Sequence, residues 1–161
     1  MLKKILVSVV AASLVAVPVG TAALAKGKKK GPKPYVSPEM TIQVGHPAFH
    51  DASGTLLTVT AQEFIRTCAI PASNGADAAV FEVPAEYKGL QAPIKAIGSG
   101  SNVGHDLDIY LFDDACTEVG FYNATGTDEY GILTADTAYV LLHNYTGDPV
   151  TAHFELAPPS K

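Results

Sequence analysis

Acidic side chains surround one short apolar segment, and carboxylates at such close spacing are typical calcium ligands. Asp106 and Asp108 stand at the start of the segment Leu107–Phe112, and Asp113 and Asp114 follow it directly. Calcium takes about six to eight oxygen ligands, often from several carboxylates. The sequence therefore predicts calcium binding at these four aspartates. The alternative is that they accept backbone N–H bonds in turns, because their spacing matches no fixed calcium loop.

The histidines offer a second, transition-metal pattern. His46 and His50 are four residues apart, but Pro47 between them opposes the helix that would place both rings on one face. The remaining histidines are His105, His143 and His153. The chain lacks the His-Glu-x-x-His zinc motif and the Gly-x-Ser-x-Gly nucleophile motif. Nothing selects two carboxylates as a catalytic pair, so we predict no catalytic residue.

The N-terminus has the three-part pattern of a secretory signal peptide. Lys3 and Lys4 precede the apolar run Ile5–Val17, and Ala23-Leu24-Ala25 supplies small residues for cleavage. We therefore expect residues 1–25 to be removed. The rest of the chain contains no second long apolar run, so we expect no transmembrane segment in the mature protein. The predicted location is extracellular or periplasmic.

The chain has two cysteines, Cys68 and Cys116. In an exported protein an even pair indicates a disulfide. Closing a loop of this length would stabilise the fold by about 4 kcal/mol in the chain-entropy model. Two free thiols, or half of a metal site, remain as alternatives, although the chain has no Cys-x-x-Cys spacing.

Charge divides the mature chain into two regions. A flexible arm, residues 26–38, carries the lysines Lys26, Lys28, Lys29, Lys30 and Lys33 and is predicted to contact polyanionic surfaces. A solvated tail without a specific partner is the alternative reading. From residue 34 onward, four basic residues stand against all 16 acidic ones. A domain this acidic repels a phosphate backbone, so we expect no nucleic-acid partner.

Short β-branched and aromatic runs between turn residues indicate strands rather than helices. The predicted strands are Thr41–Val44, Leu56–Thr60, Glu63–Ile70, Ala78–Val83, Ala92–Ile97, Leu107–Phe112, Glu118–Tyr122, Glu129–Leu133, Ala138–Asn144 and Val150–Leu156. Helical turns are expected only near 61–63 and 84–88. Strands at such spacing predict an all-β antiparallel β-sandwich or jelly roll, which we place as one domain at residues 39–158.

Alternation of side chains assigns faces to two of these strands. Leu107, Ile109 and Leu111 share one face of their strand, which we expect to face the core. The strand Ala138–Asn144 is apolar on both faces, which is typical of a central or doubly covered strand. Tyrosines are frequent in the last third of the chain: Tyr110, Tyr122, Tyr130, Tyr139 and Tyr145. They either pack within the sheets or present rings on which sugars stack.

The stretch Gly104–Asp113, with its Asp-Leu-Asp-Ile-Tyr-Leu core, resembles a strand of bacterial pre-peptidase C-terminal domains, often called PPC. The segments Asp77–Val83, Ala135–Val140 and His153–Leu156 are also similar to parts of that family. The resemblance implies a secreted, non-catalytic β-sandwich that accompanies exported enzymes, and some related modules bind calcium. The Gly that usually precedes the late Tyr of the family is replaced around Asp136-Thr137-Ala138.

The sequence therefore predicts a secreted non-catalytic accessory or binding module for an extracellular protein or polysaccharide, with calcium as a stabilising ion. Two alternatives remain. One is a small secreted hydrolase that uses acidic residues or a metal. The other is a structural envelope protein held at a polyanionic surface by its basic arm.

Overall fold

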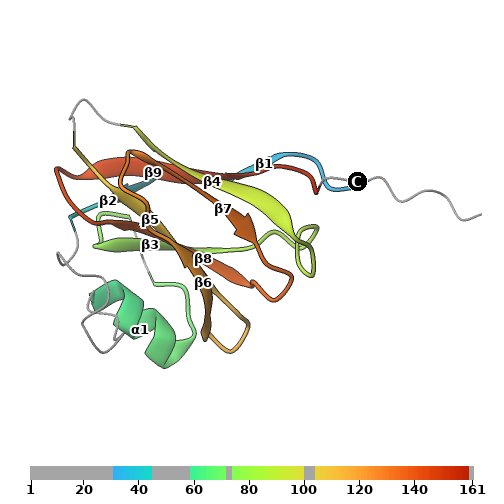
Figure 1. Cartoon of the computed structure of the whole chain (residues 1–161). Helices are drawn as coiled ribbons and strands as arrows, with labels where there is room; N and C mark the ends of the chain where they lie inside the picture. Colours follow the sequence, from blue (N-terminus) through green and yellow to red (C-terminus); the bar gives the residue numbers. More distant parts are fainter. Residues whose placement is uncertain (1–30, 45–58, 72–73, 100–103, 160–161) are drawn as a thin grey trace, which may run out of the picture.

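A computed structural model describes residues 31–44, 59–71, 74–99 and 104–159. Within these residues the chain forms an all-β fold of two stacked antiparallel sheets and one short helix (Figure 1). The predicted antiparallel β-sandwich is confirmed. The predicted signal peptide, residues 1–25, and four of the five arm lysines lie outside the described residues.

The first sheet has the strand order β1-β9-β4-β7, and β2 also pairs with β9. Its strands are β1 Tyr35–Val36, β2 Met40–Ile42, β4 Ala92–Ser99, β7 Asp128–Leu133 and β9 Val150–Leu156. The second sheet has the order β3-β8-β5-β6. Its strands are β3 Ala78–Glu82, β5 Leu107–Phe112, β6 Glu118–Tyr122 and β8 Tyr139–Asn144. Every pair of these strands is antiparallel. Eight of the ten predicted strands are present with similar bounds.

The main core lies between the two sheets. Alternate residues of β9 are buried, as are those of β4 up to Ala96, so each strand gives one face to the core and one to the outside. Leu107, Ile109 and Leu111 of β5 face this core, as predicted. Each large apolar side chain buried here contributes about 1.5–3 kcal/mol to stability.

A second apolar cluster covers the outer face of the second sheet. Helix α1, Val59–Thr67, places Phe64 against the rings of Phe112 and Tyr139, at centroid distances of 5.3 and 5.2 Å. All six residues of β5 are therefore buried. The sequence predicts that β8 is central or covered on both sides; it lies between β3 and β5, and its two faces contribute to the two apolar clusters.

The predicted strand Glu63–Ile70 is wrong, because helix α1 covers most of it. The helix also includes Val59 and Thr60, the described end of the predicted strand Leu56–Thr60. Its start is fixed from a distance: the Asp77 carboxylate accepts the backbone N–H groups of Val59 and Thr60 at 2.9 and 3.2 Å. Tertiary contacts thus override the strand preference of the β-branched residues.

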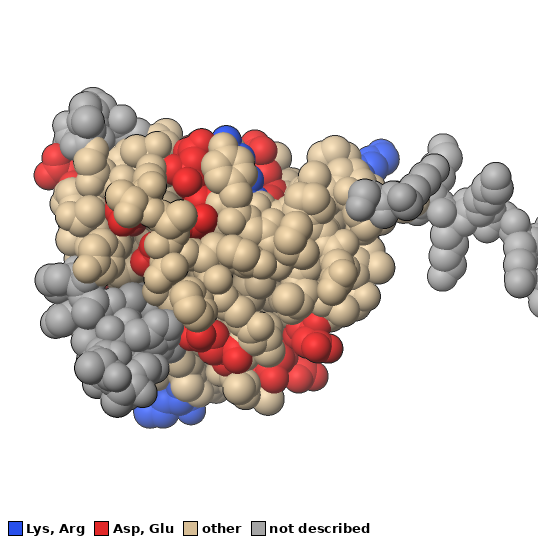
Figure 2. All heavy atoms as spheres, viewed as in Figure 1, with Lys and Arg blue, Asp and Glu red and all other residues tan. Residues whose placement is uncertain are grey.

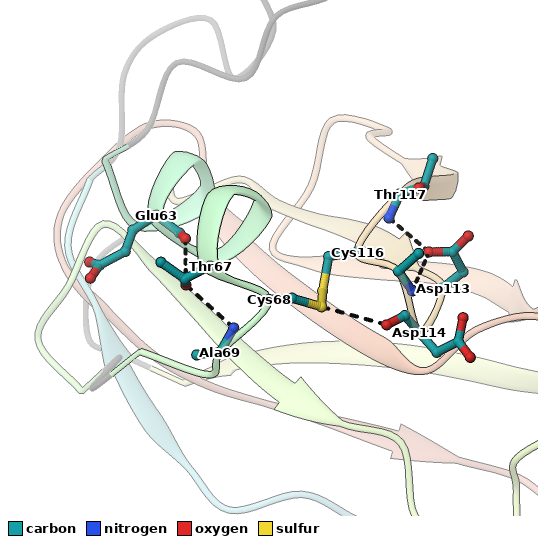
Figure 3. Close-up of a disulfide and its surroundings, with 9 residues drawn as sticks. Glu63, Thr67, Cys68, Ala69, Asp113, Asp114, Cys116 and Thr117 are labelled. Atoms are coloured by element: carbon teal, nitrogen blue, oxygen red, sulfur yellow. Dashed lines mark hydrogen bonds between the residues drawn. A yellow bond between two sulfur atoms is a disulfide. The ribbon is translucent and has the colours of Figure 1, made fainter.

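The predicted disulfide joins Cys68 and Cys116, with 5.6 Å between their Cα atoms. Figure 3 shows that it connects the end of α1 to the turn between β5 and β6. Both cysteines adopt left-handed backbone angles, with φ of 51° and 59°. Cys68 therefore ends the helix at the residue that anchors it to the sheet.

The folded domain begins earlier than the predicted boundary at residue 39. Tyr35 and Val36, which the sequence analysis placed in the flexible arm, form β1 and pair with Leu156 and Glu155. The hydroxyl of buried Tyr87 lies within hydrogen-bond distance of the carbonyl oxygens of Lys33 (2.8 Å) and Leu156 (3.1 Å). This hydroxyl holds the start of β1 and the end of β9 together. Attachment of the basic arm to polyanionic surfaces stays a prediction.

Candidate ligand-binding groove

The four predicted calcium ligands lie at opposite ends of β5. A strand rises about 3.3 Å per residue, so Asp106 and Asp113 are separated by about 20 Å. One ion cannot bind all four aspartates. Among the described residues, no group of three or more His, Cys, Asp or Glu side chains is arranged to hold a metal ion.

Two of these aspartates shape turns instead. Asp106 Oδ1 accepts the N–H of Gly126 at 2.7 Å, which draws the β6–β7 connection toward the start of β5. Asp113 Oδ1 accepts the N–H groups of Ala115 and Thr117 at 3.0 and 2.8 Å (Figure 3). These contacts match the turn-forming alternative of the sequence analysis.

Asp108 and His143 form a buried polar pair on the outer face of the second sheet. Asp108 Oδ2 lies 3.3 Å from His143 Nδ1, and the two residues are 4% and 0% exposed. Burial, with the Asp108 charge beside it, raises the pKa of Tyr110. A pair so enclosed has no solvent-accessible face for a substrate, and it fixes β5 against β8. His46 and His50 lie outside the described residues.

Glu129 is a second buried carboxylate, 4% exposed, at the start of β7. Its oxygens accept the N–H groups of Ala124 at 2.6 Å and Tyr130 at 2.9 Å. Burial raises the pKa of Glu129, although these two hydrogen bonds act in the opposite direction. Glu129 thus orders the β6–β7 turn and the backbone at Tyr130.

The outer face of the first sheet carries a row of side chains that the sequence did not reveal. Strand register pairs β1 with β9, β9 with β4, and β4 with β7. It aligns four outward-facing residues across the sheet in the order Val36, Glu155, Lys95, Tyr130. Val36 and Tyr130 keep 57% and 61% of their surface exposed. Exposed apolar and aromatic side chains therefore flank a carboxylate and an ammonium on the outer face of this sheet.

This row lies in a groove of about 500 Å³. Its lining also includes Pro34, Tyr35, Pro93 and Pro158. Prolines and paired strands restrict backbone freedom, and Tyr87 anchors the edge where β1 meets β9. The groove is therefore largely formed before any ligand binds, as is usual for ligand sites.

Lys95 is the centre of the groove's electrostatics. Its Nζ lies 2.8 Å from Asp128 Oδ2 and 5.1 Å from the centroid of the Tyr130 ring. Hydrogen bonding to Asp128, and then to Tyr130, raises the pKa of Lys95. The ammonium therefore stays charged at neutral pH and is held over the aromatic ring.

A smaller hollow of about 350 Å³ lies among the β3–β4, β5–β6 and β7–β8 turns. It is lined by the turn residues Asp113, Asp114 and Asp136, with Lys88 beside them. Lys88 is paired with Glu82 at 2.6 Å. This hollow lacks an aromatic or large apolar side chain among its lining residues, so we regard the groove on the first sheet as the stronger site.

Comparison with known proteins does not assign this chain to a family: no family model matches it, and no curated protein is similar to it in sequence. In the described part of the chain, no helix has the length and apolar character needed to cross a membrane.

Proposed function

We propose that this protein is an exported, non-catalytic module that binds an extracellular polysaccharide in the groove on its first sheet. The row Val36–Glu155–Lys95–Tyr130 carries the proposal. Export is supported by the signal-peptide pattern and by the Cys68–Cys116 disulfide. The resemblance to pre-peptidase C-terminal domains favours an accessory role beside a separate exported enzyme.

The chemistry of the row suits a sugar chain. A sugar ring offers an apolar C–H face to Tyr130, while its hydroxyls accept hydrogen bonds from Lys95 and donate them to Glu155. The Lys95 contact leaves most of Tyr130 exposed to a ligand. Neighbouring strands lie about 4.8 Å apart, so the row extends about 14 Å across the sheet. An oligosaccharide fills that length better than a single sugar does.

The test is titration of the ¹⁵N-labelled protein with neutral oligosaccharides, followed by NMR. We expect shifts confined to β1, β4, β7 and β9, and about tenfold weaker binding for Tyr130→Ala. Ile132→Ala is the matched control, because Ile132 is an exposed residue of the same strand that does not line the groove. No binding by a broad oligosaccharide panel, or equal losses in the two variants, would refute the proposal.

A further inference from the structure

The charges around the groove define which polysaccharides it accepts. On the outer face of the first sheet, the carboxylates Asp128 and Glu155 stand beside Lys95, whereas Glu39 lies near His153. Asp128 already compensates the Lys95 ammonium at 2.8 Å. Glu155, which lines the groove, is therefore a second carboxylate beside Lys95, whose single charge Asp128 already balances. Figure 2 shows the same imbalance more widely, with more acidic than basic side chains on the face in view.

Glu155 is the carboxylate available to a ligand. It lies in the middle of the row, and 46% of its side chain is exposed. Its one ion pair in the described part of the chain is with His153 Nε2, at 3.8 Å, which is longer than a hydrogen bond. His153 Nδ1 lies 4.0 Å from Glu39, so this imidazole is shared between two carboxylates. A cationic group of a ligand can therefore approach Glu155 directly.

We infer that the ligand is a polysaccharide with free amino groups, which bind as ammonium ions to the Glu155 carboxylate. This inference rests on the function proposed above. The hydroxyls of the same sugar chain meet Lys95, and its C–H face meets Tyr130. A carboxylated polysaccharide is disfavoured, because its charge would face Glu155 and Asp128 in a domain with four basic and 16 acidic residues.

A sugar chain fits this site better than a basic peptide does. Lys95 stands next to Glu155 in the row, so a run of lysines or arginines would place like charge against its ammonium. An amino sugar has one cationic position on each ring, and its remaining polar groups are neutral hydroxyls. Both kinds of ligand can place a cation against Glu155, but only the basic peptide places a second cation against Lys95.

Calorimetry with three β-1,4-linked hexamers of matched shape tests the inference at pH 6 and low salt. The hexamers are built from glucosamine, glucose and glucuronate. We expect affinity to fall in that order, with at least a tenfold difference between the first and the last. Glu155→Gln should reduce the affinity for the glucosamine hexamer to that for the glucose hexamer and leave the latter within twofold. Glu63→Gln, on α1 and outside the groove, is the matched control and should change neither.

The outcomes separate this inference from the proposed function. Equal affinities, or tighter binding of the glucuronate hexamer, would overturn the inference while polysaccharide binding stands. No binding of any hexamer would overturn the inference, and no binding by the broad oligosaccharide panel would overturn the proposed function as well. Hexalysine binding more tightly than the glucosamine hexamer would replace the polysaccharide with a basic peptide and overturn the inference as well.

Discussion

Gly131 on β7 leaves room for the ring of Tyr122, which crosses from β6 to close the open edge of the sandwich. A Cβ at position 131 would overlap the ring carbons of Tyr122, whose hydroxyl donates to the carbonyl of Ile132 at 2.9 Å. We therefore predict that Gly131→Ala lowers the free energy of unfolding by about 1–3 kcal/mol, measured by urea denaturation. Gly120→Ala is the control, because its Cβ would meet Leu111 at an ordinary 3.7 Å. Similar losses in both variants would exclude this explanation.

Glu129 gives a pH dependence whose sign follows from its raised pKa. The folded protein holds this proton more tightly than the unfolded chain, whose reference pKa is 4.5. The stability linked to Glu129 is therefore fully present below pH 4.5 and is lost as pH rises through the folded pKa. We predict that the difference in unfolding free energy between Glu129→Gln and wild type shifts in favour of the variant from pH 4 to pH 7. Urea denaturation at both pH values measures it, and a constant difference would contradict the prediction.

At the scale of elements, helix α1 shows where local sequence reasoning failed. Val59, Ile65 and Ile70 favour strands, and only the segment 61–63 was predicted as a helical turn. The residues that make the helix act from elsewhere: Asp77 caps it, and Phe112 packs on its buried Phe64. Both partners lie outside the helix, so local strand and helix preferences could not reveal these contacts. The period-2 pattern of β5, by contrast, predicted the inward face of that strand correctly.

The cap supplied by Asp77 is tested by removing its oxygens. Asp77→Ala should destabilise the protein by about 1 kcal/mol and speed hydrogen exchange of the α1 backbone amides. Asp77→Asn keeps only one of the two acceptor oxygens, so its effect should lie between those of wild type and Asp77→Ala. Native-state hydrogen exchange by NMR is the measurement. Unchanged exchange in the alanine variant would show that the capping bonds contribute little.

The disulfide is the covalent link between α1 and the sheet. Replacing Cys68 and Cys116 together by alanine should lower the free energy of unfolding by about 2–4 kcal/mol, because the unfolded chain regains the freedom of a long loop. Alanine avoids a buried hydroxyl at the enclosed position 116. Guanidinium denaturation of the oxidised protein and the double variant measures the difference. A loss below about 1 kcal/mol would show that packing of Phe64 alone holds the helix.

The whole molecule assembles the groove from parts that the sequence keeps far apart. Val36, Lys95, Tyr130 and Glu155 come from four strands and become neighbours through register alone. Alternation within β4 and β9 indicates that Lys95 and Glu155 point outward, but not that they are adjacent. The acidic stretch Asp106–Asp114, conspicuous in the sequence, is instead divided between the two ends of a buried strand.

The charge of the whole domain also sets how its stability responds to salt. From residue 34 onward, four basic residues face 16 acidic ones, so the compact state repels itself at neutral pH. Raising ionic strength from 0.01 to 0.15 M shortens the Debye length from about 30 to about 8 Å and screens that repulsion. We therefore predict that NaCl over this range raises the melting temperature at pH 7, measured by calorimetry. Near pH 3 most carboxylates are protonated, so the rise in melting temperature should disappear. A melting temperature that falls with NaCl at pH 7 would contradict the prediction, because it would show that attractive pairs such as Lys95–Asp128 outweigh the repulsion.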